Sequence, residues 1–295
     1  YKSRTNYISY KTDRIMKAVI VGKGYVGNSI FNQLIQNDYF ETVELFSRSE
    51  LDYSDPFELR RVVDRDTTVI NAAGFTGRPN VDEGEIKKEL CWDLNVKLPL
   101  TLNKVCRDIG ASIIHITSGC IYSGYEKDWE ESDEPNFGMF SNDSSFYSKS
   151  KHAFESISDY GLHLRVRMPF CDALHERSFL TKILNYNNLV NTLNSKTYVP
   201  ELCRFIEHYI TEGYDGYETI NFCNRDPLST EEIVEMMKER GIQNDDWSWE
   251  NWDNIPIKAN RSNCVMDTTK VIEQYQFNVI SEYDALTRAL DKIAE

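Results

Sequence analysis

Tyr147 and Lys151 lie four residues apart in a stretch whose pattern predicts a helix. At that spacing both side chains share one helix face, so the ammonium group can lower the pKa of the phenol. Ser118, in Thr117-Ser118-Gly119 at the end of a predicted strand, supplies a hydroxyl for the same place. The Tyr-x-x-x-Lys spacing alone is common by chance. Together with the position of Ser118, it indicates acid–base chemistry at an oxygen that takes up a proton.

A glycine-rich turn comes between the first predicted strand and the helix that follows it. Its residues are Gly22, Lys23, Gly24, Tyr25, Val26 and Gly27. Glycines at the first, third and sixth positions permit a tight turn, a close approach to a pyrophosphate and close helix packing. The helix N-terminus adds N–H donors and a favourable dipole. We therefore predict a dinucleotide site here rather than a turn with only a structural role.

The end of the second predicted strand discriminates between the two nicotinamide dinucleotides. An acidic residue there would bind the ribose hydroxyls of NAD, whereas this strand ends in Ser47 and Arg48. An arginine favours the extra phosphate of NADP, although a solvated surface arginine is the alternative. We predict NADPH, with NADH possible, and we expect Lys151 to hold the nicotinamide ribose. The small residues after the third predicted strand, where a cofactor can pass close to the backbone, are Ala72, Ala73 and Gly74.

Short β-branched runs alternate with helical stretches from Met16 onward, which is typical of a parallel sheet built from βαβ units. The predicted strands are Ala18–Val21, Thr42–Phe46, Thr67–Asn71, Ser112–Ile116 and His163–Met168. Helices are predicted after the glycine turn to Asn37, and over Pro56–Val63, Leu94–Ile109 and Tyr147–Tyr160. The fold class predicted is α/β, a Rossmann-type doubly wound parallel sheet with a smaller C-terminal α/β substrate lobe.

Changes of pattern along the chain divide it into three parts. Residues 1–15 are polar and predict a flexible N-terminal extension, and residues 16–168 predict the NADP-binding domain. Residues 169–295 predict mainly a substrate-binding lobe, with some segments returning to the sheet. The acidic stretch 124–145, rich in Gly, Pro and Ser, predicts a loop over a site.

Composition and charge narrow the possible partners. The chain has 295 residues, of which 33 are Lys or Arg and 47 are Asp or Glu, giving a net charge of -14. This balance is the opposite of a nucleic-acid or anionic-membrane binder. The seven scattered cysteines show no metal-ligand spacing, and no apolar run is long enough for a membrane helix. We expect a cytoplasmic protein with free thiols, no metal, no nucleic acid and no membrane.

These motifs, in this order and spacing, resemble the extended short-chain dehydrogenase/reductase superfamily that acts on nucleotide sugars. More specific segments are similar to the nucleotide-rhamnose synthase/epimerase-reductase family. They are Thr76-Gly77-Arg78-Pro79-Asn80-Val81-Asp82, Ser118-Gly119-Cys120-Ile121-Tyr122, Pro135-Asn136-Phe137, Ser145-Phe146-Tyr147-Ser148-Lys149, Leu164-Arg165-Val166-Arg167-Met168-Pro169 and Arg261-Ser262-Asn263. The resemblance extends from Met16 to the C-terminus. One departure is the glycine turn, which is one residue shorter than the usual Gly-x-x-Gly-x-x-Gly.

The resemblance implies roles for particular residues. It assigns the reductase triad to Ser118, Tyr147 and Lys151, and an epimerase pair to Cys120 and Lys182, leaving open which of the pair donates a proton. It also implies that Pro169 contacts the cofactor. The residues that it implies for substrate binding are Thr76, Gly77, Arg78, Asn80, Asn136, Phe137 and Arg261.

The implied activity is a bifunctional 3,5-epimerase/4-reductase that converts UDP-4-keto-6-deoxyglucose to UDP-L-rhamnose with NADPH. One alternative is a reductase only, similar to dTDP-4-dehydrorhamnose reductase. Another is a non-catalytic NADP-binding regulatory subunit, and an intact triad argues against it. Without the resemblance, Cys120 would be interpreted as a core residue, Lys182 as a solvated charge and Arg261 as part of a surface ion pair.

The implied partners follow from the same resemblance. We expect a separate upstream 4,6-dehydratase to supply the 4-keto sugar, and we expect a homodimer. Because both ligands would be polyanions, we expect a few local cations to hold them against an otherwise repulsive surface. These cations are Arg48, Arg78, Lys151, Lys182 and Arg261.

Overall fold

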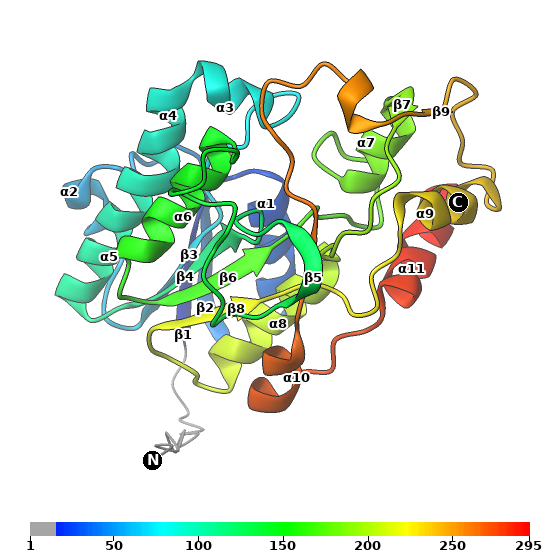
Figure 1. The fold of residues 1–295 in the computed structure, drawn as a ribbon. Helices are drawn as coiled ribbons and strands as arrows, with labels where there is room; N and C mark the ends of the chain where they lie inside the picture. The colour runs from blue at the N-terminus through cyan, green and yellow to red at the C-terminus, as the bar shows by residue number, and fades with distance from the viewer. Residues whose placement is uncertain (1–15) are drawn as a thin grey trace, which may run out of the picture.

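A six-stranded parallel sheet forms the centre of the molecule in the computed structural model, which describes residues 16–295 (Figure 1). The strands are β1 (Met16–Val21), β2 (Phe40–Phe46), β3 (Thr67–Asn71), β4 (Ser112–Ser118), β6 (Leu162–Val166) and β8 (Glu218–Asn221). Most of β1 and all of β3 and β6 are buried, as expected for strands with helices on both faces. This confirms the predicted fold class.

The strand order is β2-β1-β3-β4-β6-β8, and every pairing is parallel. The direction of winding therefore reverses between β1 and β3. In open α/β sheets a crevice forms outside the carboxyl ends of the strands at such a point. The glycine turn follows β1 and the Ala72–Gly74 segment follows β3, so both lie at this crevice.

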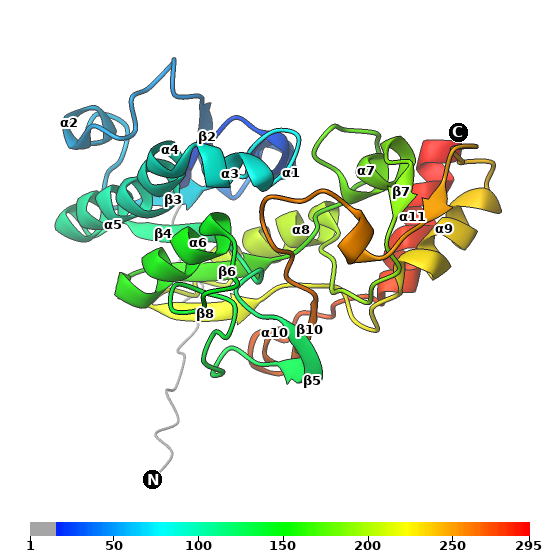
Figure 2. The same ribbon diagram turned by 45° about the horizontal axis from the view of Figure 1, so that its top comes forward.

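Helices cover both faces of the sheet (Figures 1 and 2). On one face, α1 (Tyr25–Leu34) and α8 (Val199–Thr211) share a buried apolar cluster with alternate side chains of the strands. On the other, α2 (Pro56–Leu59) and α5 (Leu98–Ile109) pack on the opposite side chains, with α6 (Phe146–Ile157) beside them. Short helices α3 (Asp82–Ile86) and α4 (Lys88–Trp92) and a π-helical turn, Asp93–Lys97, lead into α5.

A second apolar core lies to one side of the sheet, beneath three helices that Figure 2 shows grouped together. These are α7 (Phe179–Asn185), α9 (Thr230–Lys238) and α11 (Glu282–Ala294). A small parallel sheet of β7 (Asn188–Leu189) and β9 (Ser248–Trp249) lies beside this core. A second small parallel sheet, β5 (Gly124–Trp129) with β10 (Cys264–Met266), buries its side chains in a separate apolar cluster. A 3-10 turn, Trp252–Asn254, and α10 (Thr269–Tyr275) complete the elements of residues 16–295. The domain boundary at residues 168 and 169 stays a prediction.

The structure differs from the sequence prediction in stretch 124–145. Its first six residues form β5, which pairs with β10 about 140 positions later in the chain. The strand is mostly exposed and therefore lacks the apolar alternation by which strands are recognised. Helix α2 also ends at Leu59 rather than Val63. The predicted extension, residues 1–15, lies outside the described residues.

Within residues 16–295 no helix is both long and apolar enough to cross a membrane. All seven cysteines are free thiols in the structure, as expected.

Candidate active site

The glycine turn is closely packed on two sides and open on the third. A Cβ on Gly22 would lie 2.5 Å from the backbone N of Ala73, and one on Gly27 would lie 2.0 Å from the carbonyl oxygen of Gly22. Gly22 also has a φ of 104°, in the region that favours glycine. A Cβ on Gly24, the N-cap of α1, would meet no atom within 4 Å. The open side at a helix N-terminus without acidic residues in its first turn suits a pyrophosphate.

At the end of β2 a carboxylate, Glu50, connects the strand end to the glycine turn. Its Oε1 lies 2.9 Å from the Lys23 ammonium, and its Oε2 accepts a 2.8 Å hydrogen bond from the backbone N of Ser47. The hydrogen bond from Lys23, followed by the one from Ser47, lowers the pKa of Glu50 to about 2. Arg48, next to Ser47, is exposed. Sequence reasoning missed Glu50, because the carboxylate comes three residues after Ser47 and meets Lys23 only through the fold.

Backbone contacts hold the segment after β3 in the crevice. The N–H of Ala72 donates to the carbonyl of Val21 at 2.9 Å, and that of Ala73 donates to Asn71 Oδ1 at 3.1 Å. A Cβ on Gly74 would lie 3.3 Å from Lys151 Nζ. This close approach places the small-residue segment directly beside the predicted triad.

Ser118 ends β4, and Tyr147 and Lys151 lie in the first part of α6, which begins after the N-cap Ser145. The side-chain oxygen of Ser145 accepts a hydrogen bond from the N–H of Ser148 and fixes the start of the helix beside β4. The Lys151 ammonium lies 5.9 Å from the centre of the Tyr147 ring. The structure thus brings together the three triad residues that the sequence predicts.

Burial dominates the proton affinity of Tyr147. It raises the pKa of the phenol, with Cys120 adding to the effect and a hydrogen bond with Ser118 opposing it. The lowering of this pKa by the Lys151 ammonium stays a prediction, and the net shift is upward because the phenol is desolvated. Tyr147 remains a protonated phenol at neutral pH, as a proton donor must.

Lys151 is also buried, and burial lowers the pKa of its ammonium to about 8, against the opposing effects of Cys91, Glu155 and Cys120. Its charge is therefore present at neutral pH and is lost in mildly alkaline solution.

Cys120 follows Ser118 and Gly119 in the turn after β4, and its backbone N–H donates to Ser118 Oγ at 3.1 Å. Lys182 lies on α7, on the side of the second core. Burial lowers the pKa of Lys182, and Arg177 and Arg261 lower it further, whereas Cys120 raises it. The predicted amine thus lies within electrostatic range of the predicted thiol.

Four of the predicted substrate residues lie in the loop between β3 and α3, which contacts the segment before α7. Arg177 donates to Thr76 Oγ1 at 3.2 Å and to the carbonyl of Gly77. Arg78 forms an exposed ion pair with Glu176 at 3.2 Å. The loop after β3 is therefore connected to the segment that carries Lys182. Asn80, the fourth predicted residue of this loop, accepts a hydrogen bond from the backbone N of Asp82 at 2.9 Å.

Arg261, just before β10, forms an ion pair with Asp82 at 2.8 Å. Although partial burial raises the pKa of Asp82, hydrogen bonds from Arg261 and from the backbone of Ala259 lower it overall. The other two predicted substrate residues are in the loop before α6. Asn136 donates to and accepts from the backbone of Ser123, and Phe137 is buried.

Pro169 follows β6, and its carbonyl accepts a 2.9 Å hydrogen bond from the N–H of Phe179, the first residue of α7. It thus lies between the sheet and the helix that bears Lys182.

A buried polar cluster behind Lys151 was not found from the sequence. The side chain of Asn95 donates to the carbonyl of Phe75 at 3.0 Å and to Ser150 Oγ at 3.0 Å, and accepts from the N–H of Phe75 at 2.8 Å. Asn95 lies in the π-helical turn, so no regular helical spacing indicates its direction. It fastens the backbone after β3 to α6.

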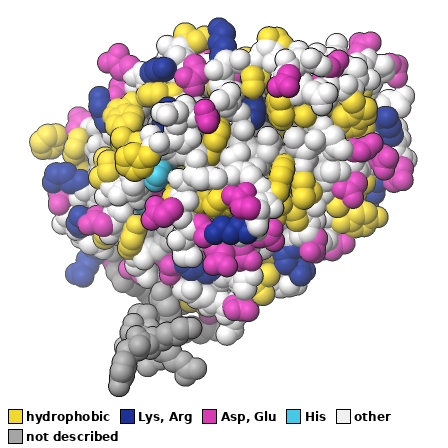
Figure 3. All heavy atoms as spheres, in the orientation of Figure 1, with side chains coloured by type: hydrophobic (Ala, Val, Ile, Leu, Met, Phe, Trp, Pro, Cys, Tyr) yellow, Lys and Arg dark blue, Asp and Glu magenta, His cyan; other side chains and the backbone are white. Residues whose placement is uncertain are grey.

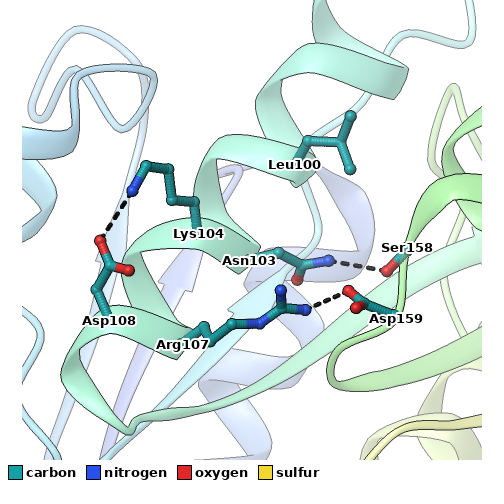
Figure 4. Close-up of a pocket in the computed structure, with 7 residues that line it drawn as sticks. All are labelled: Leu100, Asn103, Lys104, Arg107, Asp108, Ser158 and Asp159. Atoms are coloured by element: carbon teal, nitrogen blue, oxygen red, sulfur yellow. Dashed lines mark hydrogen bonds and ion pairs between the residues drawn. The ribbon is translucent and has the colours of Figure 1, made fainter.

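A surface cavity of about 270 Å³ lies elsewhere, at the amino-terminal edge of the sheet (Figure 4). Its lining comes from α5 and the turn after α6, and its cations are already paired, Lys104 with Asp108 and Arg107 with Asp159. Neither the triad nor the glycine turn borders it. Within residues 16–295 no group of three or more His, Cys, Asp or Glu side chains could hold a metal ion.

Known proteins resemble this chain over most of its described length. A trifunctional UDP-glucose 4,6-dehydratase/UDP-4-keto-6-deoxy-D-glucose 3,5-epimerase/UDP-4-keto-L-rhamnose-reductase of Arabidopsis thaliana is 36% identical over 224 residues, covering 71% of this chain and 32% of that protein. The chain therefore spans about a third of that relative's length. A bifunctional dTDP-4-dehydrorhamnose 3,5-epimerase/dTDP-4-dehydrorhamnose reductase of Arabidopsis thaliana is 35% identical over 222 residues, covering 70% of this chain and 71% of that protein.

The crystal structure of the L780 UDP-rhamnose synthase from Acanthamoeba polyphaga mimivirus superposes with a TM-score of 0.81 at 25% identity, covering 94% of this chain and 99% of that one. These relatives confirm the resemblance expected from the sequence. The family described as the RmlD substrate binding domain matches residues 16–295. Because that match extends over all the described residues, the chain belongs to the RmlD substrate-binding-domain family.

Proposed function

We propose that this protein is a bifunctional 3,5-epimerase/4-reductase that converts UDP-4-keto-6-deoxyglucose to UDP-L-rhamnose with NADPH. The observation that carries the proposal is the convergence of two sets of side chains. Ser118, Tyr147 and Lys151 meet beside the crevice, and Lys182 on α7 lies within electrostatic range of Cys120 in the turn after β4. The first set suits ketone reduction, and the second suits proton exchange next to the ketone.

The residues around the crevice fit a dinucleotide. The open space at Gly24, the N-terminus of α1 and the small residues after β3 accept a pyrophosphate and ribose, and Lys151 lies where it can hold the nicotinamide ribose. When bound, NADPH supplies the hydride for the carbonyl carbon. Arg48 at the end of β2 supports NADPH over NADH, although Glu50 beside it adds a negative charge.

In the reduction, Tyr147 donates a proton to the carbonyl oxygen, and Ser118 forms a hydrogen bond to that oxygen as negative charge develops. The raised pKa of Tyr147 keeps this proton in place until the oxygen becomes basic. Lys151 carries the positive charge that favours this transfer.

In the epimerisation, the 4-keto group acidifies the protons on carbons 3 and 5. A base removes each proton and an acid returns one on the opposite ring face, through an enolate. A thiol and an amine at Cys120 and Lys182 can fill these roles. Burial lowers the pKa of Lys182 and so makes its proton easier to give.

Proton exchange tests the epimerase half without the reductase half. The 4-keto sugar nucleotide is incubated with the protein in deuterated water and without NADPH, and deuterium is located by mass spectrometry and NMR. We expect incorporation at carbons 3 and 5, and its loss in Cys120→Ala and Lys182→Met. No incorporation by the wild-type protein would leave a reductase that needs an already epimerised substrate.

A coupled assay tests the reductase half and the choice of nucleotide. UDP- and dTDP-4-keto-6-deoxyglucose are each supplied with NADPH or NADH, and the product sugar is identified. Both nucleotides occur in the names of the relatives, so the comparison decides between them. We expect Tyr147→Phe to lower NADPH oxidation at least about a hundredfold. Unchanged oxidation in that variant would remove Tyr147 from the mechanism.

Further parts of the proposal concern the surroundings of the protein. We propose a cytoplasmic location, which the seven free thiols support, and a separate 4,6-dehydratase that supplies the keto sugar.

We also propose a homodimer. Exposed apolar side chains on α4, on the loop before α6 and at the end of α6 support it, namely Leu90, Met139, Phe140 and Ile157. Figure 3 shows apolar side chains gathered over this part of the surface. Light scattering coupled to gel filtration tests the oligomeric state.

A further inference from the structure

Three buried polar side chains lie in a row across the sheet, on the face that α5 and α6 cover. Asn71 on β3 is in register with His115 on β4, which is in register with His163 on β6. Their exposed fractions are 4%, 1% and 0%. The residues two positions earlier on β3 and β4, Val69 and Ile113, belong to an apolar cluster. Because a buried polar group costs free energy unless it is hydrogen-bonded, this row calls for an explanation.

Hydrogen bonds extend from this row to the crevice on one side and to α5 on the other. The N–H of Ala73 donates to Asn71 Oδ1 at 3.1 Å, and Asn71 Nδ2 lies 3.0 Å from His115 Nδ1. Across the ring, His115 Nε2 lies 2.6 Å from Asn103 Oδ1. Asn103 Nδ2 donates to Ser158 Oγ at 2.8 Å, a bond that Figure 4 shows. The Ala73 N–H in the crevice is thus the first donor of a continuous chain.

The first bond fixes the direction of all the others. A backbone N–H can only donate, so Asn71 presents its oxygen to Ala73 and its NH2 group to His115. An NH2 group also only donates, so Nδ1 of His115 must accept and carries no proton. The proton of the neutral ring then lies on Nε2, from which Asn103 Oδ1 accepts it. The hydrogen-bond network therefore assigns one tautomer to His115.

The surroundings of His115 agree with a neutral ring. Burial lowers the pKa of His115 well below its ordinary value, and His163 and Lys151 lower it further. Phe154 on α6 meets the ring edge-on, with 4.9 Å between the ring centres. A proton on Nδ1 would place an N–H against the NH2 group of Asn71, where two donors would oppose each other. Neither the charged ring nor the other tautomer fits this chain.

The place of Ala73 determines how the Ala72–Gly74 segment lies between the glycine turn and α6. A Cβ on Gly22 would lie 2.5 Å from Ala73 N, and one on Gly74 would lie 3.3 Å from Lys151 Nζ. The segment therefore has little room to move in either direction. A displaced Ala73 would disturb both the predicted pyrophosphate site and the predicted ribose site.

We propose that His115 is a positioning residue for NADPH binding, whose unprotonated Nδ1 holds the Asn71 amide and through it the Ala73 N–H in the crevice. The consequence for NADPH rests on the proposed function, which places the dinucleotide in this crevice. The hold on Ala73 does not rest on it, because the hydrogen bonds exist without a ligand.

Two substitutions separate this role from packing. The side-chain oxygen of asparagine can take the place of Nδ1, so His115→Asn keeps an acceptor for Asn71 and loses the donor to Asn103. The longer glutamine places its amide near Nε2, so His115→Gln keeps that donor and leaves the NH2 group of Asn71 without an acceptor. Asparagine leaves the larger cavity, so urea denaturation should show His115→Asn to be no more stable than His115→Gln.

NADPH binding should rank the two variants in the opposite order. By fluorescence titration we expect the Kd for NADPH to rise about tenfold or more in His115→Gln and to stay within about threefold of the wild-type value in His115→Asn. A Kd that rises equally in both variants, or more in His115→Asn, would leave packing as the only role of His115 and overturn the proposal.

Amide exchange of Ala73, followed by NMR of protein labelled with 15N-alanine, tests the same hold without a ligand. We expect His115→Gln to exchange this proton at least about tenfold faster than the wild-type protein and His115→Asn. Equal exchange in the two variants would overturn the proposal. If exchange follows this expectation but the wild-type protein binds no NADPH, the proposed function fails and the hold on Ala73 stands. If NADPH binds both variants equally well, the function stands and the inference fails.

The tautomer of His115 gives a test on the wild-type protein alone. NMR of protein labelled with 15N-histidine distinguishes the protonated from the unprotonated ring nitrogen. We expect the proton on Nε2 and no titration of this ring between about pH 6 and 8. A proton on Nδ1 would overturn the proposal, and this result decides if neither variant folds.

Discussion

We expect the buried ammonium of Lys151 to make cofactor binding sensitive to alkaline pH. Its pKa in the folded protein is about 8, below the ordinary lysine value, so the charge is present below that pH and is lost above it. We predict that the Kd for NADPH, measured by fluorescence titration, rises as pH passes through about 8, because the neutral amine holds the ribose less well.

Lys151→Arg is the matched control, because arginine stays charged across this range. Its Kd should change little between neutral and alkaline pH, even if its absolute affinity is lower. A wild-type Kd that is flat across pH 8 would contradict the role given to this ammonium.

The carboxylate of Glu50 lies between Lys23 and Ser47, where we predict that the adenosine phosphate of NADPH binds. We predict that Glu50→Gln tightens NADPH binding by up to about fivefold and leaves NADH binding nearly unchanged, since an exposed ion pair is weak. The control is Glu58→Gln on α2, which removes a surface ion pair with Arg61. It should change neither Kd. Weaker NADPH binding in Glu50→Gln would mean that Glu50 positions Lys23 rather than competing with phosphate.

Residue type and spacing predicted Ser118, Tyr147 and Lys151 because these residues lie on two regular elements whose relation follows from the βαβ pattern. The carboxylates Glu50 and Asp82 were not predicted. Each meets its cation only after distant segments pack together, and acidic residues are too common in this chain to stand out.

At the scale of elements, the turn from β1 into α1 depends on Gly27 more than on Gly24. A Cβ on Gly27 would overlap the carbonyl of Gly22, whereas one on Gly24 would enter open space. We predict that Gly27→Ala lowers the free energy of unfolding by about 1–3 kcal/mol and weakens NADPH binding.

Gly24→Ala should leave the free energy of unfolding unchanged within about 0.5 kcal/mol. Urea denaturation measures the unfolding of both variants. Equal stability of the two would show that the turn relaxes around an added methyl group and that the close packing is not required.

The sheet and most of its helices were predictable because apolar periodicity reports burial against neighbours in the same βαβ unit. The pairing of β5 with β10 was not, since the exposed strand Gly124–Trp129 is specified by a partner far along the chain. The contacts of Arg167 were not predictable for the same reason. Its guanidinium donates to acceptors on three separate segments, at Gly119, Asn194 and Ser262.

At the scale of the whole molecule, ion pairs cross between the sheet and the part of the chain after residue 168. Arg78 in the loop after β3 meets Glu176, and Asp82 at the start of α3 meets Arg261. Figure 3 shows acidic and basic side chains intermixed over the visible face. Two of the cations predicted to hold a nucleotide sugar thus have carboxylate neighbours.

We predict that Glu176→Gln lowers the KM for the nucleotide sugar by up to about fivefold with kcat unchanged. In the wild-type protein the substrate phosphate must displace the Glu176 carboxylate from Arg78, and in the variant it need not. Glu239→Gln, which removes a carboxylate beside Arg240 after α9, is the control for the change in net charge. A KM that falls equally in both variants would assign the effect to net charge alone. A raised KM in Glu176→Gln would contradict the displacement of Glu176 from Arg78 by the substrate.

The ion pairs of these cations should also weaken the binding of small anions. A single inorganic phosphate would have to displace a carboxylate that the fold holds beside the same arginine or lysine, and such a tethered group competes at a high effective concentration. A dinucleotide or nucleotide sugar can engage the N-terminus of α1 and several cations at once, so it gains enough contacts to replace these carboxylates together. We therefore expect these carboxylates to act as built-in counter-ions that keep inorganic phosphate out of the predicted binding sites.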